Sequence, residues 1–349
     1  MLENRDSIHR IIDTVEIDPD RRLFHQQVPF SLYEPGHVST EMLFNNLQQL
    51  IYTRFYSANQ AGHGDSQAPA EIGHRHAEAP SVVGHREAAA HSEAAGAFVR
   101  RLREANTSKE RWDRHWSIAG ISPQGNFHVI KGNYARIAYS GEFIKEDFSQ
   151  RHPQANDRIK LLARKEYFHD QQSFYFVFGQ SMAEAQQEWL CRFYFNIAPE
   201  GAAGLVAAIS GMFNRYSIPF EFKCLSKPEY YTRTDAAVLY LENRYFPIGL
   251  QLLRSIYGDL SGYFRDACPL FTKKLAPGFA FAENPYSSGE SFGTSRCGLI
   301  ARSILKAYDQ GMRKDHWPQA VATLIENEGF KLAAFYLNPD SHYPYRFEL

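Results

Sequence analysis

Residues 219–241 read PFEFKCLSKPEYYTRTDAAVLYL, and this stretch decides the fold. Its first part alternates in the period of two that is typical of a half-buried strand, with Lys223 opposite the apolar face. A proline ends that strand because it supplies no ladder donor, and a second strand follows at 236–242. If the two strands pair, Lys223 and Tyr240 share a face and Arg233 lies on the connecting segment. The stretch therefore predicts a lysine, an arginine and a phenol close together, while a surface lysine and a snorkelling arginine are the ordinary alternative.

The composition limits the class of protein. The chain has 349 residues, which is enough for one large domain or two. Its 38 lysines and arginines nearly balance its 39 acidic residues, which argues against a protein that coats nucleic acid or an anionic membrane through bulk charge. The 4 cysteines are far apart, as expected of reduced thiols rather than a disulfide frame or a zinc site. No stretch approaches the roughly 18 apolar residues of a membrane span, so we expect a cytoplasmic protein without nucleic-acid or membrane partners.

Composition also divides the chain into three parts. Residues 1–60 form an N-terminal helical segment, with an amphipathic packing helix predicted at 40–55. Residues 61–93 form a low-complexity insertion rich in histidine and alanine, with too few large apolar residues to order itself. Its histidines could bind a metal, but a solvated linker explains them better. Residues 94–349 form the main domain, which begins with a helix at 94–103.

Deletion of residues 61–90 is expected to leave the melting temperature almost unchanged, because this segment lacks the apolar residues that would tie it to a core. Thermal unfolding of the deleted and full-length chains measures this directly. A large drop in melting temperature would show that the segment packs against the rest of the protein.

A further candidate pair lies on a predicted hairpin. Residues 114–141 contain no acidic residue, and a Pro-Gln-Gly-Asn turn joins strands near 116–121 and 127–131. In a straight strand His128 and Lys131 face opposite ways, so they can serve one site only if the turn after the lysine swings it round. A single hydrogen-bonded, half-buried histidine is the alternative interpretation of His128.

Two arginines join the candidates from later segments. Residues 191–197 alternate cleanly and place Arg192 on the polar face, which a solvated outer face would explain equally well. The loop at 282–296 is rich in Gly, Ser and Pro and leads into a helix, so its amides and Arg296 form a plausible anion cradle. A serine cap on an ordinary surface helix is the alternative. The continuous aromatic run at 173–178 predicts a central strand.

The order of strands and helices is irregular and shows no repeat. It predicts an α+β fold with a largely antiparallel, curved sheet flanked by helices. The motifs GxxxxGK(S/T), GxGxxG, GxSxG, HExxH and CxxC do not occur in the sequence, which removes the common nucleotide, hydrolase and zinc interpretations. We therefore expect a cation-rich site that uses neither a metal nor a cofactor.

Five segments carry a resemblance to a known family. They are, in chain order, GNFHVIKG, RFYFNIAPEG, PFEFKCLSKPEYYTRTDAAVLY, PLFTKKLAPGFAFAENP and SFGTSRCGLIA. These segments resemble the HopA class of type III effectors and their homologues, and the resemblance covers roughly Trp112 to Tyr308. Some homologues in lanthipeptide and thioamitide pathways act beside a kinase-like protein as lyases. They remove phosphate from phosphoserine or phosphothreonine and leave a dehydroamino acid.

The resemblance implies a role for each candidate. Beta-elimination needs a base for the Cα proton, an acid for the leaving phosphate oxygen, and cations around the phosphate, but no metal. By motif, Lys223 in FKCLS is the expected base and His128 in FHV the expected acid. The residues expected to hold phosphate or substrate are Arg233, Arg296, Lys131, Tyr240 and Arg192.

The sequence departs from the lyase pattern at two positions. Asn126 stands where the lyases have a lysine two residues before the acid histidine, and Lys131 is the expected replacement. Glu242 stands where they have a lysine two residues after the tyrosine, which weakens the role expected for Tyr240.

Two functions therefore remain open. The first is a lyase whose partners are a phosphorylated peptide substrate and a separate kinase-like protein. The second is an effector-like interaction protein, in which the same cationic surface binds a partner without turnover and which would be secreted into a host cell.

Overall fold

The computed structural model describes residues 2–30, 38–58, 85–132, 134–168, 173–181, 190–286 and 290–348. Residues 61–84 of the predicted insertion lie outside the described residues. The end of the predicted insertion is already helical, because α3 spans His85–Ala105. The alanines and glutamates at the start of α3 favour a helix, which explains why it begins before residue 94.

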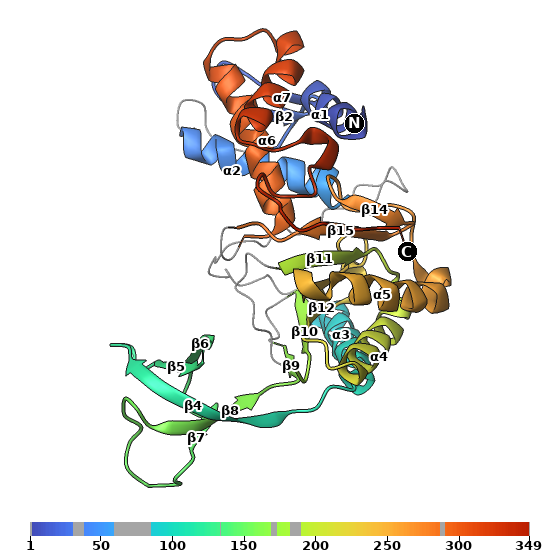
Figure 1. The fold of residues 1–349 in the computed structure, drawn as a ribbon. Coiled ribbons are helices and arrows are strands. Elements are labelled where there is room, and N and C mark those ends of the chain that lie inside the picture. Colours follow the sequence, from blue (N-terminus) through green and yellow to red (C-terminus); the bar gives the residue numbers. More distant parts are fainter. Residues whose placement is uncertain are drawn as a thin grey trace.

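A seven-stranded sheet occupies the centre of the molecule (Figure 1). Its strand order is β14-β15-β11-β13-β12-β10-β9, and every pair of neighbours is antiparallel. This arrangement confirms the predicted α+β class. The strands are β9 (Glu166–Tyr167), β10 (Phe174–Phe178), β11 (Leu190–Phe195), β12 (Glu221–Leu225), β13 (Ala237–Glu242), β14 (Lys273–Ala276) and β15 (Phe279–Glu283).

The aromatic run at 173–178 corrects one expectation. It forms β10, but this strand is second from the edge of the sheet rather than central. Only Tyr175 and Val177 are buried, whereas Phe174 and Phe176 on the opposite face are partly exposed. A run of aromatic side chains therefore does not require burial on both faces.

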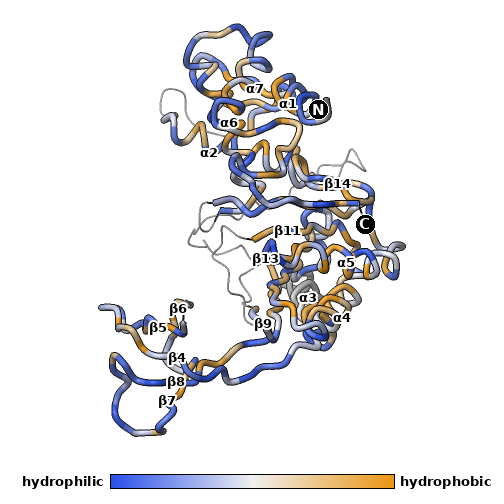
Figure 2. Tube along the Cα trace, in the orientation of Figure 1, coloured by the Kyte–Doolittle hydropathy of each residue, from blue (hydrophilic) through white to orange (hydrophobic). Residues whose placement is uncertain are grey.

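One face of the sheet is covered by α3, α4 (Pro199–Arg215) and α5 (Phe246–Leu260) (Figure 1). The proline at the first position of α4 suits a helix start because its missing N–H would be unpaired there in any case. Figure 2 shows apolar residues along β11, β13 and α4. The core between this face and the helices includes Phe193, Phe195, Phe222, Leu239 and Phe281.

The opposite face meets a group of helices near the N-terminus, called here the helical group. Its members are α1 (Leu2–Thr14), α2 (Thr40–Ile51), α6 (Phe292–Asp309) and α7 (Trp317–Asn327). The helix predicted at 40–55 is thus confirmed as α2, which continues into a π-helix at Tyr52–Tyr56. The small strands β1 (Val15–Ile17), β2 (Leu23–His25) and β3 (Val28–Pro29) complete the group. Among the described helices, none is both long and apolar enough to cross a membrane.

Residues 109–165 form a separate five-stranded sheet that projects from the body and is called here the arm (Figure 1). It contains the predicted hairpin as β4 and β5, with strand order β6-β5-β4-β8-β7. One of its faces has a small core of its own, built on Trp116, Ile118, Val129 and Ile159. The strands are β4 (Arg111–Ile121), β5 (Phe127–Lys131), β6 (Tyr134–Ala138), β7 (Phe143–Lys145) and β8 (Arg158–Ala163).

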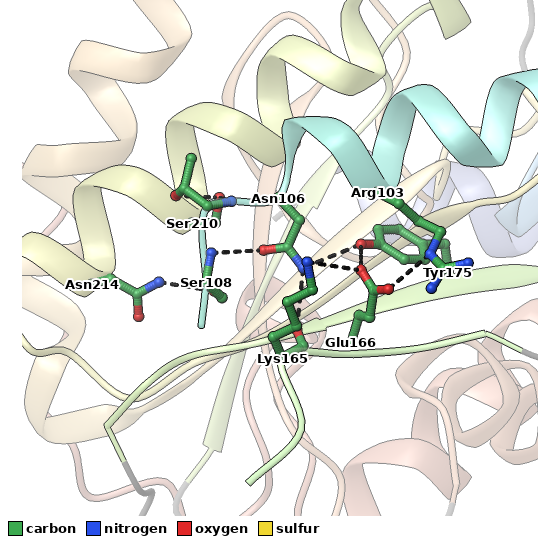
Figure 3. Close-up of polar contacts among 9 residues, drawn as sticks. Arg103, Asn106, Ser108, Lys165, Glu166, Tyr175, Ser210 and Asn214 are labelled. Atoms are coloured by element: carbon green, nitrogen blue, oxygen red, sulfur yellow. Dashed lines mark hydrogen bonds and ion pairs between the residues drawn. The ribbon is translucent and has the colours of Figure 1, made fainter. Parts of the chain in front are cut away.

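Polar contacts hold the root of the arm, where the chain leaves and re-enters the body (Figure 3). Asn106 Nδ2 donates to the carbonyl of Lys165 at 3.2 Å and to the hydroxyl of Tyr175 at 3.1 Å. Tyr175 in turn donates to Glu166 Oε2 at 2.7 Å, and Arg103 Nε donates to Glu166 Oε1 at 2.7 Å. The departing and returning chains are therefore fastened to each other and to β10.

Candidate functional site

Lys223 lies on the face of the large sheet that meets the helical group, as the alternation predicts. In the β12–β13 pairing, Lys223 is opposite Val238 and Glu221 is opposite Tyr240. The Lys223 Nζ lies 5.6 Å from the centre of the Tyr240 ring and 4.5 Å from that of Phe174. Within the described chain, Lys223 is half-buried and forms no ion pair. Cation–π attraction, rather than a carboxylate, therefore holds its ammonium group.

Arg192 brings a second cation to the same place from β11. It pairs with Tyr240 across the strands, and its Cζ lies 5.0 Å from the centre of the tyrosine ring. Its Nε donates to Asn284 Oδ1 at 2.7 Å and its Nη2 to the carbonyl of Glu290 at 3.0 Å. Arg192 is only 6% exposed, so it is a fixed, buried charge rather than part of a solvated outer face. Arg192, Lys223 and Tyr240 are called here the cationic face.

Neighbouring groups keep the cationic face positive. Burial acts to lower the pKa of Arg192, but the nearby phenols of Tyr194 and Tyr240 outweigh it, so this pKa lies above its ordinary value. Burial raises the pKa of Tyr194 to about 12, with Arg192 acting in the opposite direction. Desolvation also raises the pKa of Glu221, an effect that Lys223 and Arg192 only partly offset. Arg192 therefore stays charged, and Tyr194 stays neutral near neutral pH.

Arg233 is close to the cationic face but is already paired. Its Nε and Nη2 donate to the two carboxylate oxygens of Asp235 at 2.9 and 2.8 Å, and Nη2 also donates to the Tyr52 hydroxyl at 3.0 Å. The Tyr52 hydroxyl donates to Asp235 Oδ2 at 2.9 Å. This corrects the expected role of Arg233 as a phosphate ligand, because a buried carboxylate already neutralises its charge.

The Asp235 carboxylate should make stability depend on pH. Burial acts to raise the pKa of Asp235, but Arg233 and Tyr52 outweigh it, so this pKa lies below its ordinary value. A carboxyl of this kind contributes stability above its unfolded pKa of about 3.9 and loses that contribution as the pH falls towards its folded pKa. We expect Asp235→Asn to lower the free energy of unfolding by roughly 3 kcal/mol at neutral pH, with the difference shrinking below about pH 4.

Urea unfolding of both proteins across this pH range measures the difference. Asp315→Asn is the matched control, because Asp315 pairs with Arg313 at the surface, where their side chains are 54% and 80% exposed. A loss at Asp235 that is equal at every pH would contradict the ionic origin of the effect.

Arg296 also lies elsewhere than expected. It is 1% exposed, its Nε donates to the carbonyl of Phe335 at 2.9 Å, and its Nη2 donates to the carbonyl of Leu337 at 2.9 Å. Its guanidinium carbon lies 4.7 Å from the ring centre of Phe292 and 4.6 Å from that of Phe330. Burial lowers the pKa of Arg296 to about 10. The anion-cradle interpretation is corrected, because this guanidinium fastens α6 to the C-terminal segment and is closed to a phosphate.

His128 and Lys131 are on the arm, apart from the cationic face (Figure 1). The period of two correctly predicts that they face opposite ways: His128 is exposed, whereas Lys131 Nζ lies 2.9 and 3.0 Å from the two carboxylate oxygens of Asp113. This arrangement does not bring either side chain to Lys223, because β5 belongs to the separate sheet of the arm. The turn after Lys131 therefore does not unite the pair with the site.

Two tyrosines beneath the site were not predicted from the sequence. The π-helix after α2 carries Tyr52 and Tyr56, whose ring centres are 5.0 Å apart. A Cβ at Gly293 would collide with both rings, so glycine at this position permits the close approach of α6. A π-helix cannot be recognised from hydrophobic periodicity, although such segments occur often at functional sites. Asp235, in contrast, lies within residues 219–241, the stretch on which the prediction of the site was based.

The cationic face can attract an anion and present one amine to it. Lys223 is the half-buried cation of the face, while Arg192 supplies fixed charge behind Tyr240. No group of three or more histidine, cysteine or carboxylate side chains suited to a metal occurs in the described parts of the chain. The four cysteines are free thiols, in agreement with the sequence.

A comparison with known protein families shows which class of proteins part of this chain resembles. Residues 169–341 match the model of the HopA1 effector protein family. This segment includes the cationic face, Arg233 and Arg296, whereas the arm precedes it. That part of the chain is therefore similar to a family of effector proteins.

Two solved structures are also similar to the chain. The effector protein from Pseudomonas syringae pv. tomato strain DC3000 is 13% identical, with 97% of this chain and 99% of that chain covered and a TM-score of 0.45. The effector protein from Pseudomonas syringae pv. syringae strain 61 is also 13% identical, with 96% and 97% covered and a TM-score of 0.49. No curated protein matches the sequence.

Proposed function

We propose that the protein is a carbon–oxygen lyase that removes phosphate from phosphoserine or phosphothreonine in a peptide and leaves a dehydroamino acid. A separate kinase-like protein would supply the phosphorylated peptide. The observation that carries the proposal is the position of Lys223, half-buried, without an ion pair among the described residues, and beside Tyr240 and Arg192.

The reaction needs few groups. After the Lys223 ammonium has released a proton to solvent, its amine takes the Cα proton, the electron pair of that bond forms the Cα=Cβ double bond, and the Cβ–O bond breaks to release phosphate. The positive charge of Arg192 stabilises the negative charge that grows on the leaving phosphate. Its fixed position makes this stabilisation available without reorganisation, because Asn284 and the Glu290 carbonyl already hold the guanidinium.

The proton for the leaving oxygen is assigned to Tyr240 rather than to His128. Both cations of the face lie against the Tyr240 ring, whereas His128 lies on the arm. Glu242 lies two residues from Tyr240 on the same strand face, and its Oε2 is 2.7 Å from Arg244 Nε, so an ion pair already balances its charge.

An interaction protein without turnover is the second candidate. The pairing of Arg233 with Asp235 and the burial of Arg296 favour it, because they leave fewer cations for a phosphate than the lyase pattern provides. In this case the cationic face would bind an acidic partner and change nothing chemically.

Mass spectrometry of a phosphorylated peptide separates the two. Elimination of phosphoric acid removes about 98 Da per site from the phosphopeptide, whereas hydrolysis removes about 80 Da and simple binding removes nothing. We expect the larger loss, and we expect it to persist in excess chelator because the proposed steps use only side chains. A loss of the smaller size would reject the lyase, and an unchanged mass with measurable binding would favour the interaction protein.

A further inference from the structure

The arm carries an unusual share of the apolar surface of the molecule. Of the 14 large apolar side chains found exposed in the described residues, 7 lie between Trp112 and Phe148. The most exposed of all is Phe148, at 69%. Exposed apolar residues scattered singly need no explanation, but a concentration of them on one small sheet is typical of an interaction surface.

Several of these side chains share one face of the arm. Across the β5–β6 pair, Ile137 is opposite His128, and across the β7–β8 pair, Ile144 is opposite Lys160. Ile130 is two residues from His128 and so lies on the same face. Ile130, Ile137 and Ile144 are 43%, 52% and 37% exposed, while the residues of the other face form the core of the arm. This exposed surface is called here the outer face.

The arm as a whole is basic, with 11 lysines and arginines against 6 acidic residues, although the chain is balanced. Lys131 and Lys145 lie on its core side, whereas Arg158 and Lys160 of β8 lie on the outer face. Arg158 Nη2 lies 3.2 Å from His115 Nδ1, so two basic groups meet on this sheet. Glu146 is the carboxylate that offsets them, with its Oε2 3.5 Å from Arg158 Nε. Lys160 Nζ lies 4.6 Å from the ring centre of Phe148, and no carboxylate among the described residues pairs with it.

We infer that the outer face is a docking surface for an acidic polypeptide segment with apolar side chains. Its basic groups match carboxylates, and its isoleucines match aliphatic side chains. Acidic residues are interspersed with the basic ones on the arm, and Glu146 lies beside Arg158, which disfavours a uniformly anionic polymer or membrane surface. This inference holds whether or not the cationic face is catalytic.

Fluorescence anisotropy with a labelled peptide that alternates glutamate and leucine tests the inference. We expect the full-length protein to bind it, to lose about tenfold in affinity when salt rises from about 50 to 200 mM, and to lose about tenfold more on Ile137→Asp or Lys160→Glu. A peptide that alternates lysine and leucine should not bind. A labelled oligonucleotide and anionic phosphatidylserine vesicles complete the set of probes.

Matched substitutions on the body control for charge and polarity. Ile248→Asp on α5 repeats the first change at a residue that is 41% exposed, and Lys306→Glu on α6 repeats the second at an exposed lysine. Both should bind the acidic peptide normally, and all four variants should keep the melting temperature of the parent. Equal loss in the body variants, no binding of the acidic peptide by the parent at about 100 μM protein, or binding of only the oligonucleotide or vesicles would overturn the inference.

Discussion

Lys223→Ala is expected to abolish the elimination of phosphate, with turnover reduced by at least about 10³-fold, while the dissociation constant of the phosphopeptide changes only a few-fold. A base acts mainly in the transition state, so its removal affects turnover far more than binding. Single-turnover mass spectrometry gives the rate, and binding of a labelled phosphopeptide gives the affinity. The wild-type structure supports a folded variant, because Lys223 is half-buried and holds no buried carboxylate.

Two matched variants isolate the role of the amine. Lys223→Arg keeps the positive charge, but a guanidinium does not lose its proton near neutral pH, so binding should survive and turnover should not. Lys227→Ala removes a lysine beyond β12 whose Nζ lies 5.2 Å from the ring centre of Tyr230, and it should leave both quantities unchanged. Normal turnover by Lys223→Ala or Lys223→Arg would reject Lys223 as the base.

Arg296→Ala is expected to destabilise the protein by roughly 3–5 kcal/mol, which is a large part of the stability of a typical domain. The substitution leaves the carbonyls of Phe335 and Leu337 without their donors and removes the side chain that packs between the rings of Phe292 and Phe330. The midpoint of guanidinium-induced unfolding, compared at unchanged m-value, measures the loss.

Arg302→Ala is the control on the same helix. Arg302 is exposed, and its guanidinium carbon lies 5.9 Å from the ring centre of Phe44, so its loss should change stability by less than about 1 kcal/mol. If Arg296→Ala left stability intact and weakened phosphopeptide binding instead, the phosphate-binding role expected from the sequence would return.

The alternation of apolar and polar residues predicted the features that depend on neighbouring positions in the sequence, such as the face of a strand on which a side chain lies. The period of two placed Lys223 and Tyr240 on one face and put His128 and Lys131 on opposite faces of their strand. The same alternation identified the strand of Arg192. The sheet, its antiparallel pairing and the α+β class follow from these strands and the turns between them.

The hydrogen-bond partners of Arg233 and Arg296 could not be predicted in the same way. Arg296 donates to carbonyls 39 and 41 residues further along the chain. Every residue has a backbone carbonyl, so the sequence does not indicate which ones accept these hydrogen bonds. The hydroxyl that contacts Arg233 belongs to Tyr52, which is 181 residues away. The separation of His128 from Lys223 is a property of how two sheets are joined, and a residue pattern within one strand carries no information about it.

The fastening at Asn106 bears on how this architecture can change during evolution. Because the side chain of Asn106 reaches the carbonyl of Lys165, the chain leaves the body and returns to it at neighbouring points (Figure 3). Within the described ranges, the five strands of the arm pair with one another and none is shared with the central sheet. Topologically the arm is an insertion between α3 and β9, so a short peptide could bridge the gap without rethreading any strand of the body. Loss or exchange of this module is therefore compatible with retention of the sheet that carries Lys223.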